Sequence, residues 1–78
     1  MEEQKIKQDN IFIGRNIKKI RKQKNLKQTE IVAEMQLMGV DITREALVKI
    51  ERGIQHIYAS QLKALKEILN TTYEELLK

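Results

Sequence analysis

Apolar side chains recur at helical spacing in five segments of this chain. Ile13, Ile17 and Ile20 follow the i, i+4, i+7 pattern that places three side chains on one face of a helix. The chain has no proline and only three glycines, so few residues interrupt a helix. We expect helices over about residues 11–25, 28–38, 44–52, 59–69 and 72–77. Short loops join these segments, which predicts an all-α fold, a compact five-helix bundle.

The expected helix ends coincide with residues that favour them. Thr43 and Thr72 are good N-caps, and Thr72-Tyr73-Glu74-Glu75 has the spacing of a capping box. Residues suited to a left-handed stop follow four of the segments, namely Asn25, Gly39, Gly53 and Asn70. These signals are local, so they predict where each helix begins and ends.

Seventy-eight residues are enough for one small domain. Residues 1–10 are polar and lack apolar periodicity, so we expect a flexible N-terminal arm followed by a folded domain over 11–78. The alternative for the arm is DNA minor-groove contact through Lys5 and Lys7. A small aliphatic core also favours pairing with a second copy of the chain.

Positive charge is concentrated in the first expected helix and the turn that follows it. Seven Lys or Arg and no acidic residue lie between Arg15 and Lys27, in a chain whose net charge is +4. Such a stripe favours a polyanionic partner, although a solvated helix face is the simpler interpretation when the stripe is taken alone.

The segment after Thr43 has two distinct faces. On a helical wheel, Ala46, Leu47 and Ile50 fall on one side. The opposite side carries three long polar side chains and one methyl-bearing side chain, from Arg44, Glu45, Val48 and Lys49. A helix that binds in the DNA major groove needs this division, because the groove offers donors, acceptors and thymine methyls.

Residues for other chemistries are scarce. The chain has no cysteine and a single histidine, His56, so a metal site, a cofactor or thiol catalysis is not expected. Neither a nucleophile with an adjacent base nor a glycine-rich phosphate loop is present, and we do not expect an enzyme. No apolar run reaches membrane-spanning length and the N-terminus is unlike a signal peptide, so we expect a cytoplasmic, nucleoid-associated protein without a membrane partner.

The order and spacing of these residues resemble the Xre/Cro family of phage and bacterial helix-turn-helix regulators, over about residues 12–77. Most of the matching residues are apolar; they include the run Ile50-Glu51-Arg52-Gly53, and their order and spacing together carry the resemblance. The other matches are Ile13, Gly14, Ile17, Ile20, Arg21, Leu26, Gln28, Ile31, Val32, Thr43, Leu47, Leu62, Leu65, Leu69, Glu75, Leu76 and Leu77. About five extra residues near 36–40 resemble a subgroup with a lengthened second helix or turn. The resemblance implies a lambda-repressor-like fold with its motif over about 28–53.

The resemblance also implies site residues. Thr43, Arg44, Glu45 and Lys49 would face the major groove, and Gln28 would contact a phosphate or an outer base. The phosphate backbone would be met by Arg52 and by the backbone of Gly53, Ile54 and Gln55. Arg21 and Glu51 would form a structural ion pair, and the wheel places both beside the core.

Simpler interpretations exist for several of these residues. Arg44 and Lys49 can merely solubilise the helix, although Val48 would then be an exposed apolar residue without a use. Glu45 can accept from cytosine N4 or pair with Lys49 at i+4. Gln28 can be an ordinary helix-start residue.

The sequence therefore predicts a sequence-specific transcriptional regulator, a repressor that binds a near-palindromic site on double-stranded DNA as a homodimer. The alternative is an antitoxin-type or adaptor module with a protein as its main partner, favoured by the apolar residues Leu37, Met38 and Val40. A dimer seam of Ile57, Tyr58, Tyr73 and Leu77 is as well supported as ordinary packing of these residues.

Overall fold

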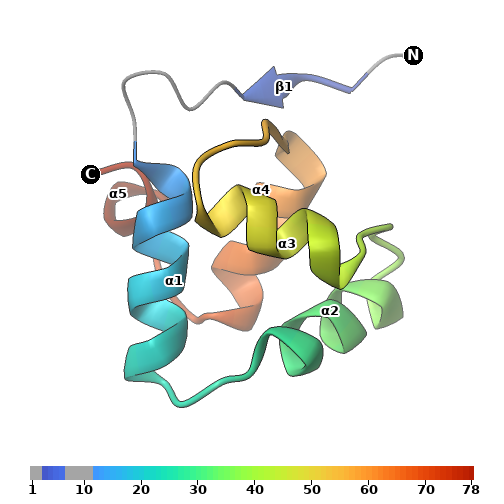
Figure 1. Ribbon diagram of the computed structural model, residues 1–78, viewed down its shortest axis with the longest axis horizontal. Coiled ribbons are helices and arrows are strands. Elements are labelled where there is room, and N and C mark those ends of the chain that lie inside the picture. Colours follow the sequence, from blue (N-terminus) through green and yellow to red (C-terminus); the bar gives the residue numbers. More distant parts are fainter. Residues whose placement is uncertain (1–2, 7–11) are drawn as a thin grey trace.

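The computed structural model describes residues 3–6 and 12–78, and in this part of the chain five helices surround one aliphatic core (Figure 1). The helices are α1 (Ile13–Gln23), α2 (Gln28–Leu37), α3 (Arg44–Glu51), α4 (Ala59–Ile68) and α5 (Tyr73–Leu76). Two short strands, β1 (Lys5–Ile6) and β2 (Ile57–Tyr58), pair antiparallel. The expected all-α, five-helix fold is confirmed, with this small sheet as an addition.

Local sequence signals determine the helix ends. Thr43 Oγ1 accepts from the backbone nitrogen of Ala46 at 3.1 Å, and Thr72 Oγ1 accepts from that of Glu75 at 3.2 Å. The four expected left-handed stops all have positive φ, at 56° for Asn25, 78° for Gly39, 75° for Gly53 and 50° for Asn70. Each helix boundary in the described residues therefore lies within two residues of its expected position; residue 11 lies outside them.

The core is aliphatic and joins all five helices of the described residues, since Leu76 of α5 is also fully buried. Its fully buried members come from every long helix and include Ile13, Ile17, Ile31, Met35, Leu47, Ile50, Leu65 and Leu69. Burial of one such side chain contributes roughly 1.5–3 kcal/mol. Because α3 packs against both α1 and α2, its inward face is held by this core and its opposite face lies on the surface.

Residues 3–6 differ from the loose arm that the polar sequence predicts. Lys5 pairs with Tyr58, and the backbone nitrogen of Ala59 donates to Gln4 O at 3.1 Å. The Glu3 carboxylate accepts from the backbone nitrogen of Ser60 near the start of α4. These hydrogen bonds join residues more than fifty positions apart, so no local sequence pattern predicts them. Residues 1–2 and 7–10 of the expected arm, Lys7 among them, lie outside the described residues.

Of the two interpretations of Ile57, dimer seam and ordinary packing, the structure supports ordinary packing. Its side chain is 0% exposed and belongs to the core of its own chain, and Tyr58 beside it is half-buried in β2. Tyr73 and Leu77, the other residues of that group, are 41% and 40% exposed. Ile57 enters the core from β2, and Ile6, its partner in β1, packs against the same core.

The chain between α2 and α3 makes a closed turn. The Val40 nitrogen donates to Met35 O at 2.9 Å, and Gln36 Nε2 donates to Ile42 O at 3.3 Å. Ile42 enters the core, whereas Leu37 at the end of α2 is 82% exposed. Among the described residues, none of the helices has the length and apolar character needed to cross a membrane.

Candidate nucleic-acid interface

Helix α3 is anchored by its apolar side chains and exposes its polar ones. Leu47 and Ile50 are 0% exposed, which fixes the rotation of the helix about its axis. On the other face Arg44, Glu45 and Lys49 are exposed, and Val48 is half-buried. The result is an open surface with two cations, one carboxylate and an isopropyl group.

A buried ion pair holds α3 against α1. Arg21 Nε donates to Glu51 Oε2 at 2.7 Å, and Arg21 Nη2 donates to Glu51 Oε1 at 2.9 Å. Arg21 Nη1 donates to Leu26 O at 3.0 Å. The side chains are 10% and 2% exposed, so both charges lie out of water and depend on each other. This is the pair that the family resemblance implies.

Gln28 joins the same network. Its Nε2 donates to Glu51 Oε1 at 3.1 Å, and the residue is half-buried at the first turn of α2. The family resemblance implies an outward contact of Gln28 with a phosphate or an outer base. In this structure the amide nitrogen links α2 to α3, so Gln28 helps to set the relative position of the two helices, and its contact with DNA stays a prediction.

The segment after α3 presents further polar groups. Arg52, Gly53 and Ile54 are exposed, and Gln55 is half-buried. The Ile54 nitrogen donates to Lys49 O at 3.1 Å, and the positive φ of Gly53 turns the chain away from the helix axis. The single histidine, His56, is exposed beside this segment.

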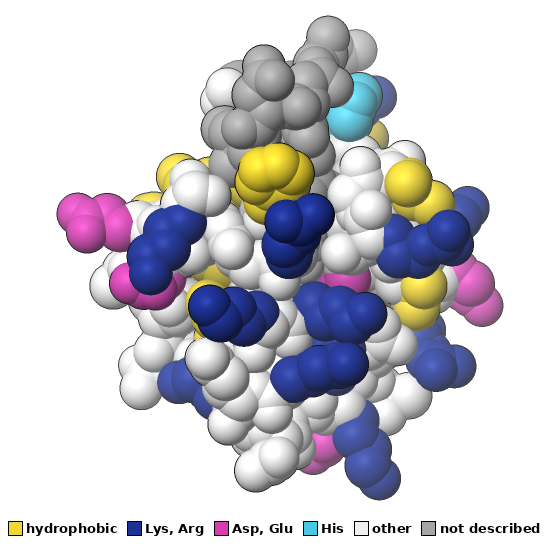
Figure 2. Space-filling model, turned by 60° about the vertical axis from the view of Figure 1, so that its left-hand side comes forward, with side chains coloured by type: hydrophobic (Ala, Val, Ile, Leu, Met, Phe, Trp, Pro, Cys, Tyr) yellow, Lys and Arg dark blue, Asp and Glu magenta, His cyan; other side chains and the backbone are white. Residues whose placement is uncertain are grey.

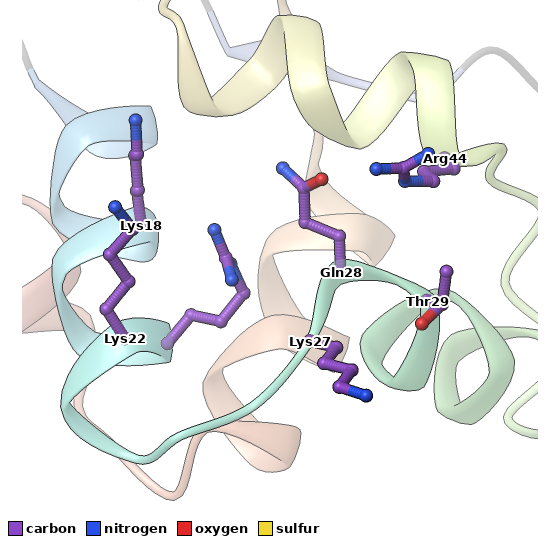
Figure 3. Close-up of a pocket in the computed structure, with 7 residues that line it drawn as sticks. Lys18, Lys22, Lys27, Gln28, Thr29 and Arg44 are labelled. Atoms are coloured by element: carbon purple, nitrogen blue, oxygen red, sulfur yellow. The ribbon is translucent and has the colours of Figure 1, made fainter.

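An open cationic groove, about 620 Å³ in volume, lies where α1, α2 and α3 meet. The residues that line it include no acidic residue; they are Lys18, Arg21, Lys22, Lys27, Gln28, Thr29 and Arg44. Figure 2 shows Lys and Arg side chains gathered at the centre of the face where α1 comes forward. Figure 3 shows Lys18 and Lys22 on the α1 side, Arg44 on the α3 side and Gln28 between them.

Four residues that line this groove were not among the predicted site residues: Lys18, Lys22, Lys27 and Thr29. Their signal was present in the sequence, because the basic run from Arg15 to Lys27 suggested a polyanionic partner. A wheel places Lys18 and Lys22 opposite the apolar face of α1. It cannot show that this face meets the start of α3, since that depends on how the helices pack.

The chemistry of this surface is that of anion binding. Ammonium and guanidinium groups donate charge-assisted hydrogen bonds to phosphate oxygens. Across residues 3–6 and 12–78, no three His, Asp or Glu side chains lie close enough together to hold a metal ion. The cationic groove is opposite in charge to the phosphates that flank a DNA major groove, and the exposed face of α3 lies beside it.

Comparison with known families agrees with this geometry. A helix-turn-helix family model matches residues 17–76, which covers most of α1 and all of α2, α3, α4 and α5. Neither the curated proteins nor the solved structures contain a match to the chain. The matched residues include the buried ion pair, the cationic groove and the exposed face of α3. The chain therefore belongs to the helix-turn-helix family of DNA-binding regulators, of the Xre and lambda-repressor-like type.

Proposed function

We propose that this protein is a sequence-specific transcriptional repressor that binds a near-palindromic operator as a homodimer. The observation that carries the proposal is the orientation of α3, with Leu47 and Ile50 buried and Arg44, Glu45 and Lys49 exposed. Two copies would place their α3 helices in successive major grooves, about 34 Å apart. Bound there, the dimer would block polymerase sterically, and its site of action would be the cytoplasmic nucleoid.

Base recognition is proposed for the middle of the exposed face. Lys49 can donate to guanine O6 or N7, and Val48 can contact a thymine methyl. Glu45 can accept from cytosine N4, and in the described residues it forms no ion pair with Lys49. Its carboxylate therefore remains open to a base. Thr43, Arg52, Gly53 and Gln55 are the proposed DNA contacts at the two ends of the helix, and Gln28 is a proposed contact at the start of α2.

Selection of bound sequences from a pool of random duplex DNA tests this function. We expect a single motif with two related half-sites whose centres are one helical turn apart, and a sedimentation mass of two chains on one duplex. Exposed Tyr73 at the start of α5 and exposed Leu77 directly after it support such a dimer. Recovery of unrelated sequences without a shared motif would refute sequence-specific binding.

We predict that Lys49→Ala weakens binding to the selected duplex by about 1–3 kcal/mol and relaxes the preference at one base pair in each half-site. The lost ammonium would have contacted a base edge, so binding to a scrambled duplex should change little. Fluorescence anisotropy with both duplexes measures the two affinities. Lys63→Ala on α4 is the matched control, because Lys63 is also exposed but lies on a helix outside the proposed interface. An equal loss on both duplexes would contradict a base contact.

The second candidate function is an adaptor or antitoxin-type module whose main partner is a protein. The observation that favours this function is an apolar surface at the end of α2, where the neighbouring residues Leu37 and Met38 are 82% and 43% exposed. A protein that binds tightly at a fixed stoichiometry, combined with no shift of any duplex, would select this function. Loss of that binding in Leu37→Asp would locate it at the end of α2.

A further inference from the structure

Arg44 stands apart from the other exposed polar residues of α3. It is the first residue of the helix and it lines the cationic groove, whereas Glu45 and Lys49 do not. Figure 3 shows its guanidinium extending toward Gln28, on the side of the groove opposite Lys18 and Lys22. Arg44 therefore shares an environment with two lysines of α1.

The groove has cations that no carboxylate of the described residues neutralises. Among the described residues, the side chains of Lys18, Lys22 and Arg44 form no hydrogen bond and no ion pair. Two further cations line the groove: Arg21, which is already paired with Glu51, and Lys27, just before the start of α2. Three unpaired cations from two helices, with no carboxylate lining the space between them, form a site for a group with several anionic oxygens.

We infer that this groove binds backbone phosphate of the DNA strand beside α3, and that Arg44 contacts phosphate rather than a base. Lys18 and Lys22 hold the same stretch of backbone from α1, so the strand is clamped between the two helices. Glu45, Val48 and Lys49 then contact the bases and determine which DNA sequence is bound. This inference rests on the proposed function and changes the role that the resemblance implies for Arg44.

A phosphate contact and a base contact by Arg44 would differ in how binding depends on DNA sequence and on salt concentration. A phosphate contact is the same on every duplex, and it releases counterions, so the slope of log affinity against log salt changes by about 0.9 for each cation lost. A contact with a guanine edge is lost only on the cognate duplex. Sequence dependence and salt dependence together therefore separate the two roles.

The experiment measures binding of the wild type, Arg44→Gln and the double variant Lys18→Gln/Lys22→Gln to the selected duplex and to a scrambled one, between about 50 and 200 mM salt. We expect each cation removed to weaken binding roughly eightfold at about 0.1 M salt, by the same factor on both duplexes, and to lower the slope by about 0.9. Arg44→Lys should keep the slope, and Lys63→Gln on α4 should change neither quantity.

Different outcomes overturn different statements. If Arg44→Gln weakens only the cognate complex, or leaves the slope unchanged, Arg44 does not bind phosphate and the inference fails while the proposed function stands. If the lysine pair behaves like Lys63→Gln, α1 is not part of the clamp. If the wild type binds no duplex, the proposed function itself fails, together with everything that rests on it.

Discussion

Replacing Glu51 with alanine is expected to lower the free energy of unfolding by about 3–5 kcal/mol. The substitution leaves the guanidinium of Arg21 buried without its counter-charge, and it removes the acceptor of the Gln28 amide. A small domain has a total stability of only about 5–15 kcal/mol, so this variant is expected to be partly unfolded at physiological temperature. Urea unfolding followed by circular dichroism measures the effect.

Two further variants show whether the loss comes from an unpaired buried charge. Arg21→Met combined with Glu51→Leu removes both charges, and its stability should return to within about 1 kcal/mol of the wild type or exceed it. Glu75 forms an exposed ion pair with Lys78, in which Lys78 Nζ and Glu75 Oε2 lie 2.9 Å apart. Glu75→Ala removes one partner of this pair and should change the free energy of unfolding by at most about 1 kcal/mol. A loss in Glu51→Ala no larger than in Glu75→Ala would contradict the buried network.

The second large effect concerns salt. Affinity for the selected duplex is expected to fall roughly 10³-fold between about 50 and 200 mM salt, with a log–log slope near −5. Lys18, Lys22 and Arg44 in each of two bound copies would neutralise about six phosphates, and the counterions released from them make binding salt-dependent. Anisotropy titrations at four salt concentrations measure the slope.

Protein stability over the same salt range serves as the control. The ion pair that joins α1 to α3 is buried, and salt screens buried pairs much less than exposed ones. The urea concentration at the midpoint of unfolding should therefore stay nearly constant as the salt concentration rises, while the affinity for DNA falls. A flat affinity over this range would show that phosphate contacts contribute little, and it would argue against the clamp between α1 and α3.

The features that could be predicted from the sequence are those that depend on near neighbours. Thr43 marks the start of α3 because an N-cap needs only a hydroxyl three residues before a backbone amide. Gly53 marks the end of α3 because a left-handed stop needs only a residue that tolerates positive φ. Leu47 and Ile50 point inward because they lie on one face of a helix with 3.6 residues per turn.

Other features depend on residues that are far apart in the chain. The pairing of Lys5 with Tyr58 has no local signal, and it turned part of an expected loose arm into a strand. Ile57 was equally suited to a dimer seam and to the core, and the position of β2 buries it. The hydrogen bond from Gln28 to Glu51 joins residues 23 positions apart, so the sequence of α2 alone does not predict it.

The sequence alone determined the helical character of this protein, the ends of its helices, the two faces of α3 and the basic run on α1, because each follows from spacing over a few residues. Only the tertiary structure decided that Lys18 and Lys22 share a groove with Arg44, and that Arg21, Gln28 and Glu51 form one network. Which helix faces meet depends on packing of the whole core, and no periodicity within a single helix contains that information.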